Sequence, residues 1–234
     1  MTTRPHSPNL ASLAAAAEKL EPLLAQIAFV GGCVTELLLT DSAAARVRPT
    51  LDVDAIVAIS SYVEFTLLEN RMRDLGFNHS LSQDAPICRW VSGDLILDLM
   101  PTDTSILGFS NRWYPPALEK AQKTKLANQE IRVITAPYFL ATKLEAFHGR
   151  GKNDFRMSHD LEDIVTVVDG RPEIVVEVHL APADVRKYLS DEFRSLLSKR
   201  DFWDALPGHL PFDDASQQRT GLVLQRMKQL ALEG

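Results

Sequence analysis

The sequence predicts an α+β fold, in which a small mixed β-sheet flanked by helices is followed by a helical C-terminal part. Two patterns support this prediction. Before residue 135, short apolar runs with the period of strands alternate with helical patterns, and the later patterns are helical. The sequence carries no internal repeat and no low-complexity tract beyond an Ala-rich first helix. We therefore predict a core domain over residues 1–135 and a helical domain over residues 136–234.

The first half alternates between the helical and the strand period. Strong helix formers open it, and Val and Ile mark the strands. The helix after the second strand begins with Ser60 or Ser61 as its N-cap, and Glu64 stands near the capping-box position. The turn chemistry of Ser92-Gly93-Asp94 predicts a hairpin. The expected elements are a helix over 10–27, a strand over 28–30, a short helix over 34–40, a strand over 51–59, a helix over 60–76 and a hairpin over 86–101.

The second half carries five helical segments. Pro137, Pro172 and Pro182 are placed like prolines of a first helical turn. The run 173–178 is also compatible with a strand, because Pro172 can end a loop, so both structures remain open there. The expected helical segments are 136–151, 158–170, 172–181, 182–206 and 214–234.

The composition is typical of a folded protein. The 234 residues are 45% hydrophobic and 24% charged. No apolar run reaches the roughly 20 residues of a membrane helix and the start lacks the apolar stretch of a signal peptide, so we expect a cytoplasmic protein without membrane contact. Cys33 and Cys88 lack metal-binding spacing and are expected to be reduced and packed. The net charge of -6 argues against a surface built as a whole for nucleic acid, although it is compatible with a local basic cleft.

Three aspartates inside apolar strands are the most informative residues. Side chains alternate along a strand, so Asp52 and Asp54 point to one face while Val53 enters the core. Two carboxylates this close repel each other unless a cation lies between them or one takes up a proton. Asp98 places a third carboxylate in a later strand, and the three converge if the two strands are neighbours. Oxygen ligands of this kind fit Mg²⁺ or Mn²⁺ rather than Zn²⁺.

These residues also have plain structural explanations. A single Asp at a strand end is commonly a turn former or a salt-bridge partner. Gly31 and Gly32 favour the functional interpretation, since their backbone N–H groups can approach a phosphate at a helix N-terminus. Together, the glycine turn and the aspartates indicate a site for a metal ion and a triphosphate.

The runs 30–32 (VGG), 51–57 (LDVDAIV) and 96–100 (ILDLM) resemble the signature of the nucleotidyltransferase fold of the polymerase beta superfamily. The resemblance implies that Asp52 and Asp54 bind two Mg²⁺ ions that hold a nucleoside triphosphate (NTP). It implies that Asp98 completes the site and helps to activate the attacking hydroxyl, while Gly31 and Gly32 form the phosphate turn. Two-metal chemistry of this kind lowers the pKa of the acceptor hydroxyl and neutralises the leaving pyrophosphate.

Residues 142–168 are similar to a segment of the AbiEii/AbiGii toxin-type nucleotidyltransferases, in which a helix lysine precedes a basic loop and an Asp-x-x-Asp helix. The resemblance implies that the lysine contacts the triphosphate and that the later acids order the site. The alternatives are a solvated lysine, basic residues that keep a loop soluble, and acids that stabilise a helix start. The matching residues are Lys143, Arg150, Lys152, Asp160 and Asp163.

One departure concerns the interval between Gly32 and Asp52. It spans nineteen residues, which is longer than is usual in the resembled family, and its extra residues must loop out.

The function implied by these resemblances is transfer of a nucleoside monophosphate (NMP) from an NTP to a hydroxyl. The acceptor in toxin-like members is often RNA, especially a tRNA 3′ end, and the tract 109–126 offers Arg112, Trp113, Tyr114 and several lysines for contact with it. Alternatively, Trp113 and Tyr114 pack a loop onto the core. A protein or small-molecule hydroxyl is the alternative acceptor, as in antitoxin-like AMP transfer or drug adenylylation, and an inactive binding module is the third interpretation. A cognate antitoxin or another protein partner is compatible with the first.

Overall fold

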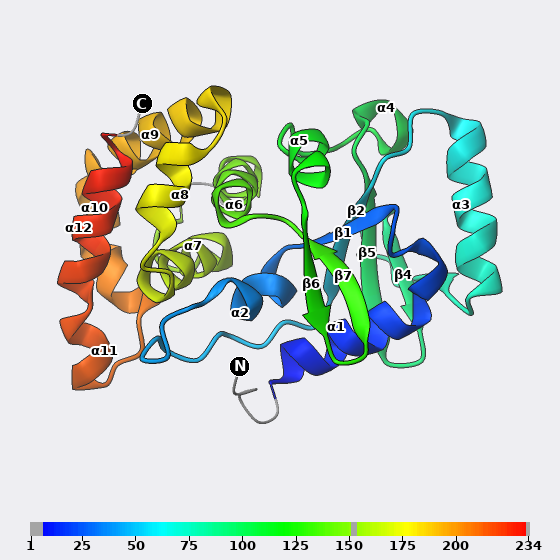
Figure 1. The fold of residues 1–234 in the computed structure, drawn as a ribbon, viewed down its shortest axis with the longest axis horizontal. Helices are drawn as coiled ribbons and strands as arrows, with labels where there is room; N and C mark the ends of the chain where they lie inside the picture. Colours follow the sequence, from blue (N-terminus) through cyan, green and yellow to red (C-terminus); the bar gives the residue numbers. More distant parts are fainter. Residues whose placement is uncertain (1–6, 151–153, 233–234) are drawn as a thin grey trace. The chain divides into compact units, whose positions relative to one another are not determined.

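The computed structural model describes residues 7–150 and 154–232, and Figure 1 shows the fold. The predicted α+β class is confirmed, because a mixed sheet with helices is followed by a helical C-terminal part. The chain forms two compact units. The sheet unit comprises Met1–Glu36 and Arg48–Thr135, and the helical unit comprises Leu37–Val47 and Ala136–Gly234. Residues 37–47, which the predicted division left in the core domain, therefore belong to the helical unit.

Seven strands form one mixed sheet in the order β3-β4-β5-β2-β1-β7-β6. β2 pairs with β5 and β1 pairs with β7 in parallel, and the other neighbouring strands are antiparallel. The parallel pairing of β2 with β5 matters most for function, because each of these strands belongs to a segment that carries a predicted site acid. The strands are β1 Ile27–Val30, β2 Val53–Val57, β3 Asn78–His79, β4 Arg89–Ser92, β5 Leu95–Pro101, β6 Gln122–Leu126 and β7 Gln129–Val133.

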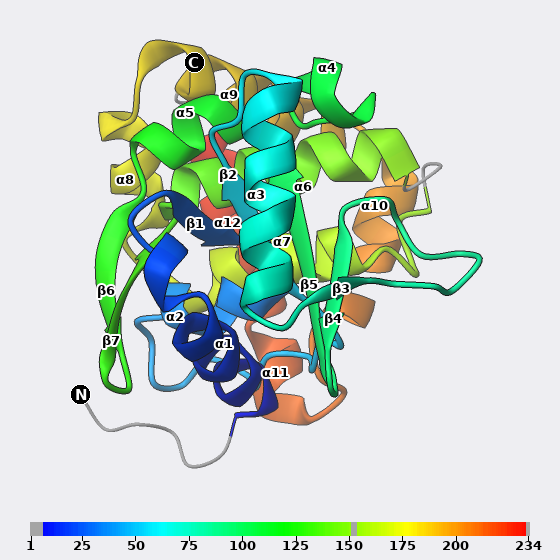
Figure 2. The same ribbon diagram turned by 90° about the vertical axis from the view of Figure 1, so that its right-hand side faces the viewer.

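Helices α1 (Pro8–Lys19) and α3 (Tyr62–Asp74) lie in front of the sheet in Figure 2. The helix predicted over 10–27 is too long, since α1 ends at Lys19 and Pro22 lies in the 3-10 turn Glu21–Leu23. Proline has no N–H to donate to the preceding turn and cannot continue a helix at that point. Two short helices complete the sheet unit, namely α4 Thr104–Leu107 and α5 Tyr114–Glu119.

The start of α3 has the predicted cap. Ser61 is the N-cap, and its Oγ accepts a hydrogen bond from the Glu64 amide at 3.2 Å. In return, Glu64 Oε2 accepts from the Ser60 amide at 2.8 Å. Two backbone donors that the helix itself leaves unsatisfied are therefore bonded, which fixes where α3 begins.

The helical unit is built on α6 (Ala136–Arg150), which packs against α7, α8 and α9. The run 173–178 forms helix rather than strand, because its apolar residues Ile174 and Val178 share one buried face. Two of the predicted segments each divide into two helices. The other helices are α7 His159–Gly170, α8 Ile174–Leu180, α9 Ala183–Leu197, α10 Arg200–Ala205, α11 Asp214–Gln218 and α12 Thr220–Leu230.

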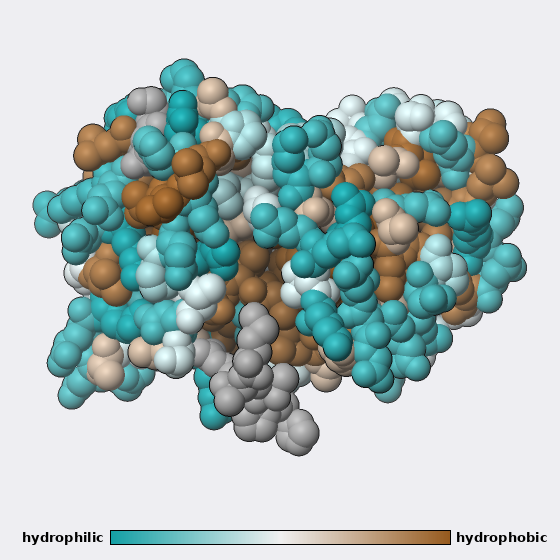
Figure 3. Space-filling view, in the orientation of Figure 1, coloured by the Kyte–Doolittle hydropathy of each residue, from teal (hydrophilic) through white to brown (hydrophobic). Residues whose placement is uncertain are grey.

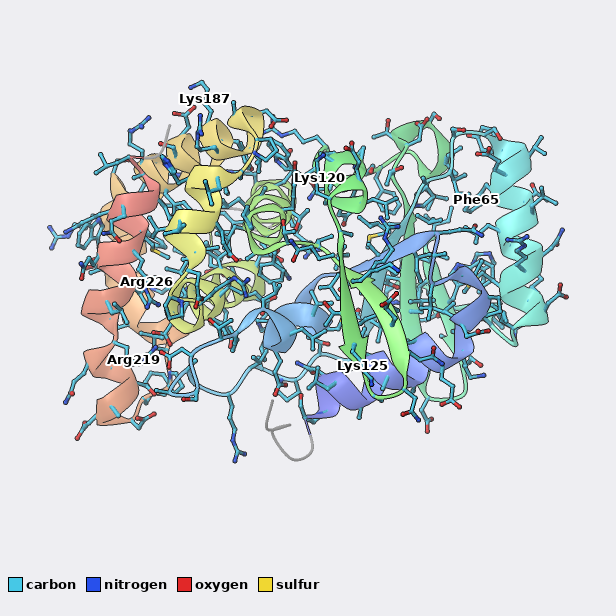
Figure 4. All side chains as sticks on the ribbon, viewed as in Figure 1. Phe65, Lys120, Lys125, Lys187, Arg219 and Arg226 are labelled. Carbon is cyan, nitrogen blue, oxygen red and sulfur yellow. The ribbon has the colours of Figure 1, made fainter. Side chains whose placement is uncertain are left out.

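The long interval before Asp52 is anchored to the helical unit. After α2 (Thr35–Leu38), the amides of Thr40 and Asp41 donate to the Gly170 carbonyl at 3.0 and 2.9 Å. Arg219, labelled in Figure 4, joins Asp41 Oδ2 at 2.6 Å to the buried Asp169 at 2.7 Å. A Cβ on Gly170 would lie 2.7 Å from a Leu39 methyl group, so the close approach needs glycine. Residues 37–47 of the interval are therefore a packed segment of the second unit.

The face of the molecule in Figure 3 is largely hydrophilic, with an apolar patch over α8. Val176 and Leu180, one turn apart on that helix, are 60% and 76% exposed. Within residues 7–150 and 154–232, no helix combines the length and the apolar character that crossing a bilayer requires.

Candidate active site

The pairing of β2 with β5 places two of the predicted acids side by side. Asp54 is the direct partner of Asp98 in the parallel register. Asp52 immediately precedes β2, two residues before Asp54, and it accepts a hydrogen bond from the Arg89 guanidinium that also bonds Asp98. Asp98 is buried, whereas the other two are partly exposed. The structure thus brings Asp54 and Asp98 together by register, and Asp52 to the same region.

Arg89 on β4 links the aspartates, and it was not among the predicted site residues. It is the antiparallel partner of Asp98. Its Nε donates to Asp98 Oδ1 at 2.8 Å and its Nη2 to Asp98 Oδ2 at 2.7 Å. The same Nη2 donates to Asp52 Oδ2 at 2.6 Å. Hydrogen bonding to the Asp98 carboxylate raises the pKa of Arg89, which stays charged.

The sequence carried one signal for Arg89. It is a single cation in the apolar run 86–92, between Cys88 and Trp90, which are both buried. A buried-strand cation needs an acidic partner, and Asp98 stands across the predicted hairpin. Burial, followed by the negative charge of Asp98, raises the pKa of the neighbouring Cys88 thiol to about 12. Cys33 and Cys88 are both buried thiols, as predicted.

Gly31 lies directly against the Asp54 carboxylate. Its φ is +71°, in the left-handed region that favours glycine. A Cβ at this position would lie 2.0 Å from Asp54 Oδ2. Gly32 is buried and begins the 3-10 turn Gly32–Val34 that leads into α2. The glycine pair therefore leaves room for the Asp54 carboxylate beside the end of β1.

The donor set fits a hard divalent cation. It consists of carboxylate oxygens, the ligands that Mg²⁺ and Mn²⁺ prefer. Arg89 Nη2 serves as a stand-in cation, since one nitrogen contacts Asp52 and Asp98 at 2.6 and 2.7 Å. The cluster contains three carboxylates and the Arg89 guanidinium. In the part of the chain that the structure describes, no three His, Cys, Asp or Glu side chains are arranged as metal ligands, so a metal needs a rearrangement of this cluster.

The residues predicted from the toxin-type resemblance lie in the helical unit, where several of them contact one another. Lys143 on α6 is buried, and its Nζ lies 2.6 Å from Asp163 Oδ2 and 3.2 Å from Asp160 Oδ1 on α7. Arg150 forks onto Asp160, with Nε to Oδ2 at 3.0 Å and Nη2 to Oδ1 at 2.8 Å. Lys152 lies outside the described residues. The cluster joins α6 to α7, and contact of its members with a triphosphate stays a prediction.

Asp160 shows how charge and burial compete in this cluster. Burial alone would raise the pKa of its carboxyl. The hydrogen bonds from Arg150 and the charge of Lys143 outweigh burial, so the pKa of Asp160 lies below its ordinary value. The acid is therefore held ionised between two cations.

In the tract 109–126, which was predicted to contact RNA, two of the aromatic side chains pack within the sheet unit instead. Trp113 is buried and Tyr114 donates its hydroxyl to Met100 Sδ at 3.3 Å. Lys123 on β6 pairs with Glu130 on β7 at 2.6 Å. Figure 4 labels Lys120 and Lys125, which flank Lys123 along the chain. The buried indole leaves no aromatic face at position 113 on which a base could stack.

Neither a family model nor a curated protein sequence matches the chain. Among solved structures, the chain is similar to an antigenic nucleotidyltransferase-like protein from Paracoccidioides brasiliensis, with 16% identity, a TM-score of 0.49, and coverage of 85% of this chain and 93% of that one. It is also similar to a nucleotidyltransferase candidate from H. pylori, with 11% identity, a TM-score of 0.46, and coverage of 97% and 93%. These values assign neither a family nor an activity, so a functional conclusion must come from the site itself.

Proposed function

We propose that the chain is a metal-dependent nucleotidyltransferase that transfers NMP from an NTP to a hydroxyl acceptor and releases pyrophosphate. One observation carries the proposal. Asp54 and Asp98 are register partners on parallel strands, and Asp52 is joined to Asp98 through a shared guanidinium nitrogen. The carboxylate oxygens of this cluster are ligands that suit a divalent cation such as Mg²⁺ or Mn²⁺.

The chain's own residues have separate roles in this proposal. Asp52, Asp54 and one oxygen of Asp98 hold the cation, which when bound would offset the charge of the triphosphate and of the leaving pyrophosphate. Gly31 preserves the space that the Asp54 carboxylate needs, since a Cβ would lie 2.0 Å from its Oδ2. Asp98 receives the proton of the acceptor hydroxyl at its other carboxylate oxygen. Both of these oxygens accept hydrogen bonds from Arg89 in the structure.

The first candidate acceptor is RNA, for example a tRNA 3′ end, as in a toxin of a toxin-antitoxin pair. The second is a protein or small-molecule hydroxyl. Two observations favour the second acceptor class. Trp113 is buried rather than presented to a base, and the net charge of -6 disfavours association with a polyanion.

A label-transfer assay tests the proposal and separates the acceptors. The full chain is incubated with Mg²⁺ and each α-labelled NTP, together with total RNA or with cell protein and metabolites. We expect Mg²⁺-dependent transfer of label to one acceptor class, and loss of that transfer in Asp54→Asn. Label on RNA supports the first acceptor, and label on protein or on a small molecule supports the second.

The matched control is Asp84→Asn, which removes the same charge from an exposed loop of the sheet unit. It should transfer label as the wild type does. If no NTP is bound or turned over with Mg²⁺ or Mn²⁺, the enzyme proposal is wrong, and a binding module of the same architecture remains.

A further inference from the structure

The position of Arg89 raises the question of how a metal would reach the acidic cluster. Its guanidinium forks onto both oxygens of Asp98 and adds a third bond to Asp52. One nitrogen, Nη2, lies within 2.7 Å of carboxylate oxygens from two different strand segments. That nitrogen lies between the two carboxylates that a divalent cation would have to share.

The two cations therefore compete for the same oxygens. A divalent ion that used Asp52 and Asp98 with the guanidinium still in place would face a like charge at short range, which is repulsive. We infer that Arg89 is a built-in counter-ion of the acidic cluster, which a divalent cation must displace from Asp52 and Asp98. This inference rests on the proposed function, and it deepens it by naming the residue that controls metal loading.

The structure favours movement of Arg89 rather than of Asp98. The Arg89 side chain is 24% exposed, whereas that of Asp98 is 10% exposed. Arginine has a long flexible stem, while an aspartate on a paired strand is held close to its backbone. Displacement of the guanidinium also leaves the second Asp98 oxygen available to accept the proton of the acceptor hydroxyl. Arg89 thereby links cation binding to the availability of the base.

Direct measurement of Mn²⁺ binding tests the inference without reference to catalysis. Free Mn²⁺ is followed by electron paramagnetic resonance in solutions of the full chain without nucleotide. Arg89→Gln should bind Mn²⁺ about tenfold or more tightly than the wild type, because the competing charge is gone. Arg71→Gln removes a charge from an exposed position of α3 and should bind as the wild type does. Adding Asp54→Asn to Arg89→Gln should abolish the tight binding, which places it at this cluster.

A second measurement uses the wild-type chain, so it does not depend on the folding of a variant. Phenylglyoxal modifies accessible arginines, and mass spectrometry locates the modified residues. Saturating Mn²⁺ should increase the modification of Arg89 severalfold and leave that of Arg71 unchanged. Unchanged or reduced modification of Arg89 in the presence of bound Mn²⁺ overturns the inference.

The two proposals fail in different ways. If the wild type binds Mn²⁺ in a manner that Asp54→Asn abolishes, but Arg89→Gln binds it no more tightly, Arg89 is not a competitor and the proposed function still stands. If neither the wild type nor a folded Arg89→Gln binds Mn²⁺, both the inference and the metal-dependent function are wrong.

Discussion

Gly31 leaves no room for a side chain beside the Asp54 carboxylate. Comparing alanine substitutions at Gly31 and Gly93 measures how much the site depends on that space. Gly31 and Gly93 have φ values of +71° and +60°, so alanine strains the backbone at both, by about 1–3 kcal/mol. A Cβ on Gly31 meets Asp54 at 2.0 Å, whereas a Cβ on Gly93 meets nothing within 4 Å. Gly31→Ala should therefore lose label transfer by about 100-fold through displacement of the carboxylate.

Gly93→Ala is the matched control for this prediction and should keep near-normal transfer. Thermal unfolding of both variants separates strain from site geometry. Equal losses of transfer in the two variants would show that backbone strain alone explains the effect.

The lowered pKa of Asp160 implies that its contribution to the free energy of unfolding is lost in acid. The pKa of its carboxyl is lowered in the folded chain, so its contribution to stability is complete above the unfolded value of about 4 and disappears as the pH falls through the folded value. The difference in free energy of unfolding between the wild type and Asp160→Asn should be constant near neutral pH and shrink below about pH 4. Urea titrations between neutral and acid pH measure this difference. A gap that stays constant or widens in acid would contradict the assignment.

At the scale of elements, the Lys143 ion pairs hold α6 against α7. Lys143→Met leaves two buried carboxylates with one cation fewer, and should cost about 3–5 kcal/mol of unfolding free energy. Lys187→Met is the control, because Lys187 makes an exposed pair with Asp191 along one helix, and it should change little. Figure 4 labels this lysine on the outer surface of α9. Chemical denaturation of the two variants gives the comparison.

The alternative prediction for Lys143, from the toxin-type resemblance, is contact with a triphosphate. It predicts weaker NTP binding in Lys143→Met with unchanged stability. A large loss of stability would identify the lysine as a structural ion-pair residue, so the same variant separates the two roles.

The elements that could be predicted are those marked by residues close together in the sequence. The cap of α3 was predictable because Ser61 and Glu64 satisfy backbone donors within one turn. The β6–β7 hairpin was missed because most of its residues are polar, and only Leu126, Ile131 and Val133 are apolar and buried, which is too few to mark two strands in the sequence. The anchoring of residues 37–47 depends on Gly170 and Arg219, which are distant in sequence. Contacts of that kind leave no mark in a local pattern.

The acids of the candidate site could be predicted from the sequence, but their pairing and their cation could not. Alternation alone placed Asp52 and Asp54 on one face, and the apolar surroundings of Asp98 identified it as a third acid. The partnership of Asp54 with Asp98 needed the strand order, since a register is a property of the folded sheet. Arg89 was missed because its role depends on the same register.

At the scale of the whole molecule, the sheet unit carries the acidic cluster, and the helical unit carries the ion pairs of Lys143 and Arg150 with the buried acids Asp160 and Asp163. We therefore expect nucleotidyl transfer to depend on Asp52, Asp54 and Asp98. Substitutions at Lys143 and Asp160 should first lower the free energy of unfolding. Measuring transfer and unfolding on the same set of variants would check this division. A variant of the helical unit that keeps full stability and loses all transfer would contradict it.

The most direct test of the central claim is Mg²⁺-dependent release of pyrophosphate from NTP by the full chain. The proposed site should release pyrophosphate from at least one NTP. Chelation of the metal and Asp54→Asn should each abolish this release, and Asp84→Asn should retain it. Release that persists unchanged in Asp54→Asn, or no release with any NTP and acceptor, would contradict the proposed function.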